Sequence, residues 1–499
     1  MFAAFVNTFR IPELRQRIIF TLIVLVFVRL GSAIPCPGIN PAVLGEFFRN
    51  TIEQSSQGNV IGMINLFSGG ALENCAIFSL TIMPYISASI IMQLAQGVIP
   101  ALGRLAREEG GRQKINQFTR LGTLFLCIVQ GYLLALSFEN PERIPMLAGI
   151  GDVMQSMGPL VPEPGIMFRL ITVVCLTGGT MLMMWMGEQI THRGIGNGVS
   201  LIIAVGILAQ FPAALVQGWN AFIPPAGSER AALPPLVLVL LIAFFFIVIA
   251  ATVMIIQAMR KIPVSYAKQI RGNRMFQGQT SYLPLKVNYA GVMPIIFASA
   301  ILMFPATMIT MLFRESELAN KIGTMLSGGM LYYTLYGTMI FFFSYFWVAM
   351  VFNPTQIADD MKRNGGFVPG VRPGDPTARF LDFSMTRLTF AGAIFLVALS
   401  VMPMFVNGMM RVPMITASFF GGTSLLIIVG VMLDTMRQAE THLLQRHYDG
   451  FLKKGRIKGR SSIDRYQTSD TLPAERIGWL LFIVGVIIIG GIVAMFVNQ

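Results

Sequence analysis

Charged residues are scarce in this sequence: 12% of its 499 residues are Asp, Glu, Lys or Arg, against about 25% in a typical soluble domain. Apolar residues make up 54%, which excludes an ordinary soluble protein. They fall in eleven stretches of roughly the 20 residues that cross a bilayer as a helix. We expect a helix at each one, because lipid leaves no water to satisfy an open sheet edge. The predicted spans are residues 16–35, 76–97, 118–138, 167–187, 198–216, 234–258, 289–312, 331–353, 386–406, 415–434 and 477–497.

The sequence also lacks the motifs that mark most catalytic and metal sites. It has no GxxxxGK[ST] phosphate loop and no HExxH pair. The four cysteines form no CxxC, and the three histidines lack metal-ligand spacing, so we predict no metal and no cofactor. Residues 194–198 are glycine-rich but lack the GxGxxG spacing of a nucleotide fold, and we interpret them as a tight turn.

Ionisable groups are almost absent from the spans themselves. Ion-coupled transporters place a carboxylate, histidine or lysine near the membrane midplane to bind the coupling ion. A passive conduit without a fixed small ligand therefore fits better. An ion-coupled secondary transporter with inverted repeats stays the alternative, and an integral-membrane enzyme is the third hypothesis.

The basic residues alternate from one side of the predicted spans to the other. Of the 37 Lys and Arg residues, 29 lie in the N-tail, in every second gap between spans or at the adjoining span ends, and in residues 437–476. By the positive-inside rule these segments and the N-terminus are cytoplasmic. The formal charge of +13 is compatible with nucleic acid, anionic lipid or an acidic partner, but orientation and lipid contact account for most of it.

Residues 60–74 break the regular pattern between the first two spans. They are half apolar, too short and too polar to cross a bilayer, yet too apolar to lie in water. They fit a re-entrant segment covered by protein, because irregular backbone survives at membrane depth only there. An interfacial helix on the outer face explains the composition equally well.

Several motifs, in order along the chain, resemble the SecY family, the channel subunit of the general protein translocon. They are residues 65–72, 82–90, 187–191, 194–198, 282–288, 351–354, 366–374 and 420–426. The resemblance extends from about residue 10 to residue 455. It implies an all-α integral membrane fold: a ten-helix bundle of two inverted five-helix halves around a central pore, with a re-entrant plug. Inverted repeats are common in membrane proteins.

The resemblance also implies a division of the chain. Residues 1–15 would be a cytoplasmic tail, 16–216 the N-terminal half with the plug at 60–74, and 217–434 the C-terminal half. The C-terminal half would carry cytoplasmic loops at 258–288 and 354–385. Residues 435–476 would form a basic cytoplasmic linker, and 477–497 a probable eleventh helix that the family does not explain. That helix is either a lipid-facing appendage or a replacement or support for a small partner subunit.

By the same resemblance, a ring of alkyl side chains closes the pore. Such a ring excludes ions by dewetting and offers a sliding polypeptide no hydrogen bonds. Val199 stands where isoleucine is usual, which predicts a slightly looser ring. The implied pore ring consists of Ile82, Ile86, Val199, Ile203, Ile296 and Ile427, and the implied plug includes Asn65, Leu66, Phe67, Ser68, Gly69 and Gly70.

The resemblance finally implies a lateral gate and cytoplasmic docking loops. The gate-lining residues would be Ser87, Gln93, Asn288 and Phe304, and the loop residues that bind a motor or ribosome would be Lys268, Arg274, Lys362 and Arg372. Arg274 is a single base where the family commonly has two. The implied partners are SecE-like and SecG-like small membrane subunits, the SecA motor ATPase, the ribosome through rRNA, signal sequences, nascent polypeptides and membrane lipids. The expected location is a bacterial inner membrane.

Overall fold

The computed structural model describes residues 12–54, 68–106, 108, 110–141, 150–223, 233–266, 269–271, 274–276, 280–299, 301–302, 330–410 and 412–453. Several predictions lie outside these residues. They concern the eleventh span, most of the basic linker, residues 303–312 of the seventh span and the first part of the proposed plug. Phe304, Lys268, Asn65, Leu66 and Phe67 are among them.

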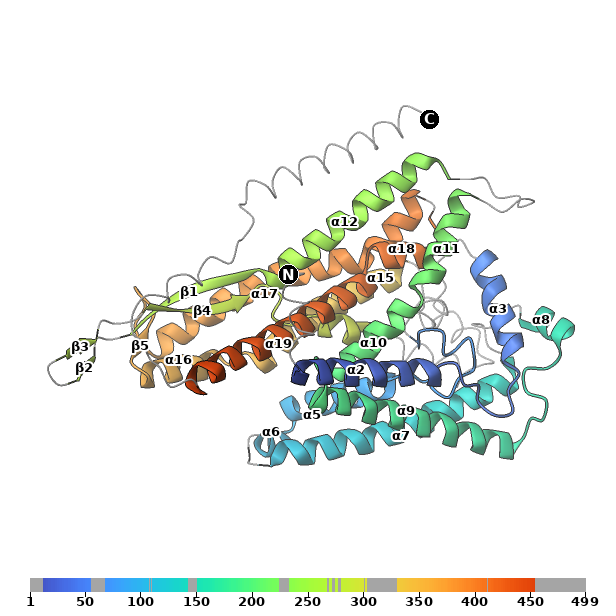
Figure 1. The fold of residues 1–499 in the computed structure, drawn as a ribbon, viewed down its shortest axis with the longest axis horizontal. Helices are drawn as coiled ribbons and strands as arrows, with labels where there is room; N and C mark the ends of the chain where they lie inside the picture. The colour runs from blue at the N-terminus through green and yellow to red at the C-terminus, as the bar shows by residue number, and fades with distance from the viewer. Residues whose placement is uncertain are drawn as a thin grey trace.

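The N-terminal part of the chain forms one group of helices, drawn in blue to green in Figure 1. Helix α7 packs against both α5 and α9, and α9 in turn contacts α2 and α10. The short helices α3 and α8 pack on each other at one end. The helices are α2 (Pro12–Gly31), α3 (Pro41–Gln54), α5 (Met83–Val98), α6 (Pro100–Leu105), α7 (Gly111–Glu139), α8 (Ile150–Met157), α9 (Ile166–Arg193), α10 (Gly198–Ala209) and α11 (Phe211–Phe222).

The C-terminal part forms a second group beside the first. Helix α15 packs on α17, and α12 packs on α19. The two groups meet where α10 contacts α19 and α11 contacts α18. The helices are α12 (Pro235–Gln257), α15 (Met330–Val351), α16 (Pro354–Arg363), α17 (Asp375–Met410), α18 (Met414–Phe420) and α19 (Thr423–Lys453), and residues 293–299 are also helical.

Seven helical stretches among the described residues are long and apolar enough to cross a membrane. They coincide with the third to sixth and eighth to tenth predicted spans. Helices α2 and α5 and the helical residues 293–299 correspond to the first, second and seventh spans. The predominantly helical, multi-span fold expected from the sequence is therefore confirmed.

Several helix ends differ from the predicted spans, and local chemistry explains them. Helix α5 begins at Met83 instead of residue 76, because Pro84 suits the first turn of a helix and residues 69–82 are turns or irregular. The tenth span is divided at Gly422, where φ is +126° and a Cβ atom would lie 2.5 Å from Pro403. Helix α19 then continues to Lys453, so the first part of the predicted linker is helical.

The predicted loop 258–288 folds largely as strands, which sequence analysis did not anticipate. Strand β1 (Met259–Tyr266) pairs antiparallel with β4 (Thr280–Lys286), from Met259 opposite Lys286 to Ser265 opposite Thr280. Strands β2 (Gln269–Arg271) and β3 (Arg274–Phe276) form a small second hairpin. On its other edge β1 pairs with β5 (Gly366–Phe367), so both predicted cytoplasmic loops share one sheet (Figure 1).

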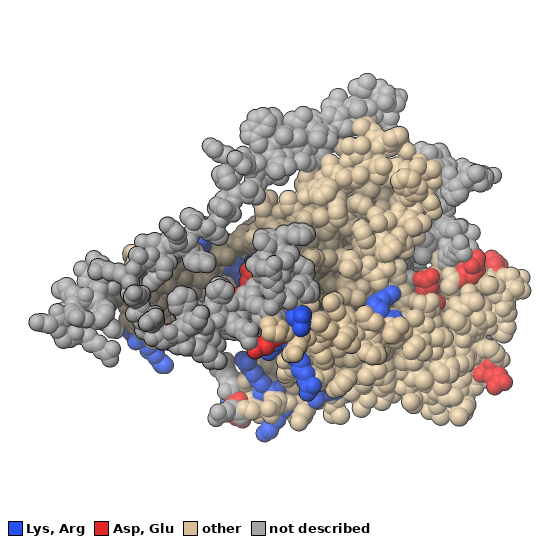
Figure 2. All heavy atoms as spheres, viewed as in Figure 1, with Lys and Arg blue, Asp and Glu red and all other residues tan. Residues whose placement is uncertain are grey.

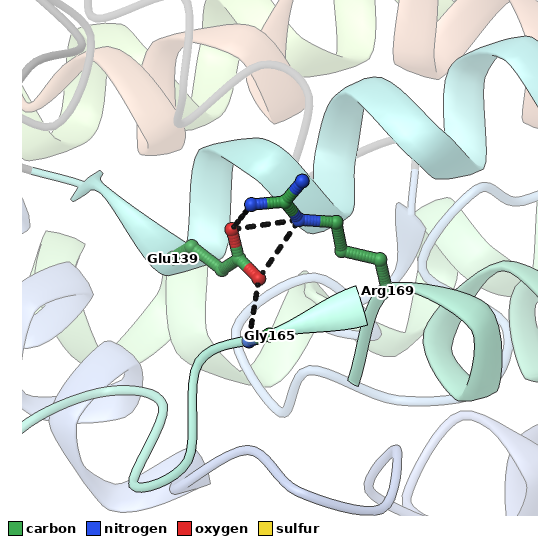
Figure 3. A network of polar contacts seen from close by, with 3 residues as sticks. All are labelled: Glu139, Gly165 and Arg169. Carbon is green, nitrogen blue, oxygen red and sulfur yellow. Dashed lines mark hydrogen bonds and ion pairs between the residues drawn. The ribbon is translucent and has the colours of Figure 1, made fainter. Parts of the chain in front are cut away.

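Two ion pairs hold α7 against α9. Arg120 and Glu188 join the start of α7 to the end of α9, with Nη2 2.6 Å from Oε2. Glu139 and Arg169 join the opposite ends, with Oε2 2.7 Å from Nη2 (Figure 3). The Glu139 carboxylate also accepts a hydrogen bond from the backbone N–H of Gly165 at 3.1 Å. The two helices therefore form one clamped antiparallel pair.

Basic side chains gather at one end of the molecule. On the face shown in Figure 2, most Lys and Arg side chains lie toward the end that carries α6, the start of α2 and the strands, together with some acidic ones. The opposite end, beside α3 and α8, shows acidic side chains on this face. We call the first of these the basic end. Its position agrees with the alternation of basic residues along the sequence.

Candidate pore and lateral gate

An apolar cavity lies between the two helix groups. Four of the six predicted ring residues line it: Ile82, Ile86, Ile203 and Ile296. Ile82 precedes α5, Ile86 lies on α5, Ile203 lies on α10, and Ile296 belongs to helical residues 293–299. Sequence positions more than 200 residues apart thus line one cavity. The other lining residues are Val28, Arg29, Ser32, Ser68, Thr81, Met83, Met183, Ile202, Gly206 and Ser299.

The remaining two predicted ring residues lie close by but do not line this cavity. Ile427 is 1% exposed in the central apolar cluster, and Val199 packs at its edge. A Cβ atom on Gly187 of α9 would lie 3.4 Å from the Val199 Cγ2 atom. Both side chains are therefore core contacts in this conformation, and the ring role assigned to them by resemblance stays a prediction.

Residues 68–82 form an irregular, largely buried segment that contributes Ser68, Thr81 and Ile82 to the cavity wall. Ala71, Ala76 and Phe78 belong to the same apolar cluster as Ile82 and Ile86. The segment is bound to the chain that follows α2: the Cys36 N–H donates to Cys75 O at 2.8 Å and the Ile77 N–H to Ile34 O at 3.0 Å. Of the two hypotheses for residues 60–74, the described part, 68–74, supports the re-entrant segment, because it lies inside the bundle.

Sequence analysis did not assign Arg29 to the pore. It lies in the last turn of α2, lines the cavity, and donates from Nη1 to Gly69 O at 2.8 Å. The sequence feature that could have pointed to Arg29 is that a basic residue interrupts the apolar run of the first span. Met183 and Ile202 gave no comparable signal, because an apolar residue on a helix is ordinarily a packing residue.

Of the predicted gate residues, Ser87 and Gln93 lie on α5 in the first helix group, and Asn288 lies beside α17 of the second group. Gln93 of α5 donates to the Ser89 hydroxyl at 3.3 Å, while its own Oε1 is buried without a hydrogen-bond partner among the described residues. Asn288 is 7% exposed and donates to Gly291 O at 3.2 Å. Ser87 is partly buried on α5. Helix α5 approaches α15 closely, since a Cβ atom on Gly97 would lie 3.1 Å from Met350 Sδ.

The turn at residues 194–198 joins the two helix groups at the basic end. Gly196 donates its N–H to the side chain of Gln438 on α19 at 2.9 Å, and Ile195 donates to the Thr21 hydroxyl of α2 at 3.2 Å. The Asn197 side chain caps α10 by accepting hydrogen bonds from Val199 N and Ser200 N. The glycine-rich sequence is thus a structural turn.

Comparison with known proteins identifies the family. A family model described as SecY matches residues 76–436. The chain is 46% identical to the protein translocase subunit SecY of Chlamydia trachomatis over 457 residues, which covers 91% of this chain and 99% of that protein. It is 43% identical to SecY of Escherichia coli K12 over 452 residues, which covers 90% and 96% respectively.

The chain belongs to the SecY family. The resemblance seen in the sequence motifs is thereby confirmed. The fold agrees with a solved protein-conducting channel, with a TM-score of 0.55, 17% identity and coverage of 91% of this chain and 99% of that one. It is also similar to Sec61 from a canine ribosome-channel complex, with a TM-score of 0.54, 18% identity and the same coverage.

The basic loops of this SecY family member form a joint surface at the basic end. Lys362 lies in the last turn of α16, and Arg372 lies on the loop between β5 and α17; both side chains are exposed. Arg260 and Lys261 are exposed on β1. Arg274 lies on β3, but its side chain is outside the described part. Because β1 pairs with β5, the bases from both loops are close to one sheet.

Proposed function

We propose that this chain is the channel-forming subunit of a protein translocase, a passive conduit that carries unfolded polypeptides across the membrane and releases apolar segments into it. One observation carries the proposal: four isoleucines from distant parts of the chain line one cavity, and Ser68 and Thr81 of the buried segment 68–82 line it with them. Alkyl groups repel water and ions, yet offer no hydrogen bonds that would hold a passing chain. We propose no catalytic chemistry, and a partner supplies the energy.

In this proposal residues 60–74 are the plug, and the contact between α5 and α15 belongs to the lateral gate. A signal sequence entering between these helices would replace weak contacts and would offer a donor to Gln93 Oε1, which has no hydrogen-bond partner among the described residues. Hydrogen bonds between helices in membranes are worth only about 0.6–2 kcal/mol. Such a seam opens and recloses at small cost, as a lateral exit requires.

The chain is a multi-pass membrane protein. We propose that it lies in a bacterial inner membrane, with its N-terminus and the basic end in the cytoplasm. The concentration of basic side chains at one end supports this orientation by the positive-inside rule (Figure 2). The SecY relatives named above are bacterial, which supports the proposal of a bacterial membrane.

The exposed bases of the joined loops are the proposed docking surface for a motor ATPase of the SecA type or for the ribosome. Basic side chains suit both, because they attract rRNA phosphates by counterion release and pair with acidic protein surfaces. Small SecE-like and SecG-like subunits, signal sequences and membrane lipids complete the proposed partners. Exposed apolar side chains along α2 and α7, such as Phe27 and Phe125, offer surfaces for lipid or for such subunits.

An ion-coupled transporter is less well supported. The middle turns of the seven long apolar helices, as far as the structure describes them, carry no Asp or Glu. A coupling ion would have no carboxylate to bind there. The two solved structures reported above as similar in fold are a protein-conducting channel and the Sec61 of a ribosome-channel complex.

Site-specific crosslinking of an arrested secretory chain tests the proposal. Ile86→Cys and Ile203→Cys should each form a disulfide with a cysteine in the arrested chain, because both side chains face the cavity. Leu121→Cys is the matched control, since Leu121 on α7 is 66% exposed on the surface of the bundle. Equal crosslinking at all three positions, or none at the two isoleucines, would refute a central polypeptide path.

A further inference from the structure

Arg29 is the charged side chain that lines the central cavity. A base in the last turn of a helix is favourable because of the helix dipole, which alone would explain an arginine at this point of α2. The dipole does not explain the direction in which the guanidinium points. The guanidinium points toward the re-entrant segment, and its Nη1 donates a hydrogen bond to Gly69 O at 2.8 Å.

Gly69 is held tightly at this contact. Its φ is +63°, and an added Cβ atom would lie 2.8 Å from Arg29 Nη1 and 2.8 Å from Gly206 O of α10. The backbone at residue 69 is therefore seated between α2 and α10, with no room for a side chain. Arg29 and Gly206 thus contact residue 69 from two different helices.

The described residues give Arg29 no carboxylate partner: the two ion pairs found there are Arg120–Glu188 and Arg169–Glu139. A hydrogen bond from a charged donor is stronger than a neutral one, particularly away from water. The half-buried guanidinium consequently depends on the Gly69 carbonyl. Moving residues 68–70 away would cost this bond and leave the charge facing the cavity.

We propose that Arg29 is a positioning residue that latches residues 68–70 against α2 and α10 while the channel is closed. The inference rests on the proposed channel function, in which this segment belongs to the plug. The latch holds by one charged hydrogen bond, so it is strong enough to bias the segment toward closure and weak enough for an entering polypeptide to break.

Arg29→Gln in the full chain, assembled with its partner subunits and reconstituted in vesicles, tests the latch. Losing one charge-assisted hydrogen bond should raise idle ion conductance about tenfold. Arg17→Gln is the matched control: Arg17 lies on the same helix and donates to Gly194 O at 3.4 Å, at the basic end. Arg29→Lys, which keeps the charge but loses the forked donor, should give an intermediate conductance.

Cys75 provides a second readout within the same segment. It is 1% exposed, so a membrane-impermeant maleimide should label it slowly in a Cys36→Ser, Cys127→Ser, Cys175→Ser background. Arg29→Gln should increase that labelling rate about tenfold in step with conductance, whereas Arg17→Gln should not. A merely destabilised bundle would instead lower the melting temperature of the complex without a selective change at Cys75, and that result would overturn the latch.

The same substitution in a chain lacking residues 62–72 separates the latch from the channel itself. The deletion should leak, and Arg29→Gln should then add nothing, because its partner is gone. If Arg29→Gln raises the idle conductance equally in the full chain and in the deletion, the latch is overturned. It is also overturned if the deletion leaks but Arg29→Gln in the full chain leaves the conductance unchanged. A deletion that does not leak would overturn the plug assignment, and the latch with it.

Discussion

The carboxylate of Glu139, the last residue of α7, is 3% exposed and is bonded by the guanidinium of Arg169 from α9 (Figure 3). Its counterpart at the basic end, Arg120 with Glu188, is considerably more open, at 48% and 22% exposure. The two pairs are nineteen residues apart on each helix, or about 28 Å. That distance is close to the roughly 30 Å thickness of a bilayer core, so we expect one pair near each membrane surface.

Glu139→Gln should therefore destabilise the protein more than Glu188→Gln. The first removes a buried carboxylate that holds both Arg169 and the Gly165 N–H, at a cost of about 2 kcal/mol. The second breaks a partly exposed pair worth about 0.2–1 kcal/mol. Thermal unfolding of the purified complex measures both. Equal losses of melting temperature would show that the two pairs contribute alike.

Ile86→Asn should raise the resting ion conductance of idle channels, because a polar side chain on the cavity wall lets water wet the constriction. Ile427→Asn should act differently, since Ile427 is buried in the same apolar cluster but does not line the cavity. It should cost about 2–4 kcal/mol of stability and change conductance less. Planar-bilayer recordings and thermal unfolding of both variants distinguish the two effects. A larger leak from Ile427→Asn would mean that it faces the pore.

Arg372→Glu should reduce motor-driven translocation by about tenfold, because it reverses an exposed charge on the proposed docking surface. The protein should still fold and insert. Arg112→Glu is the control: Arg112 is equally exposed at the start of α7, away from the joined loops. Transport into inverted vesicles measures the rate. Wild-type transport by Arg372→Glu would exclude that residue from docking.

Cys36 and Cys75 should resist alkylation until the protein unfolds. Burial is the main cause that raises the pKa of both thiols to about 12; the Cys175 thiol adds to the shift at Cys36, and the Cys36 thiol adds to the shift at Cys75. A free thiol has a pKa near 8.5. At pH 8 the folded protein then has about a thousandfold less thiolate at these positions. The same shift means that the contribution of these two thiols to the free energy of unfolding is fully present below about pH 8.5. It is lost progressively as the pH rises toward 12, because in that window only the unfolded chain loses the thiol protons. Maleimide labelling rates against pH, with and without denaturant, measure this. Rapid labelling of the folded protein at pH 8 would contradict it.

Residues 477–497 lie outside the described part of the chain, and we predict that they cross the membrane. The run holds no charge and its 21 residues reach about 31 Å as a helix. It follows a basic linker that the positive-inside rule keeps in the cytoplasm, so the C-terminus should be outside. A C-terminal tag should react with a membrane-impermeant reagent on intact spheroplasts. Labelling only after lysis would place the terminus in the cytoplasm.

Hydropathy located most of the membrane helices well. Helix α12 covers Pro235–Gln257, almost the predicted 234–258, because a helix that faces lipid must be apolar along its whole length. The same measure missed the start of α17, which begins at Asp375 instead of residue 386. That first part is polar and lies beyond the membrane, where hydropathy no longer distinguishes helix from loop.

Composition and charge alternation by themselves determined that this chain threads a membrane, and which end is basic, because lipid imposes the same requirement on every span. The ordered motifs determined the family. Only the tertiary structure decided which residues share the cavity: Ile82 and Ile296 meet there, while Ile427 and Val199 pack beside it. It also brought the two basic loops into one sheet and turned Arg29 onto Gly69. Such contacts join residues far apart in sequence, and they depend on helix rotation and backbone path, which no local pattern encodes.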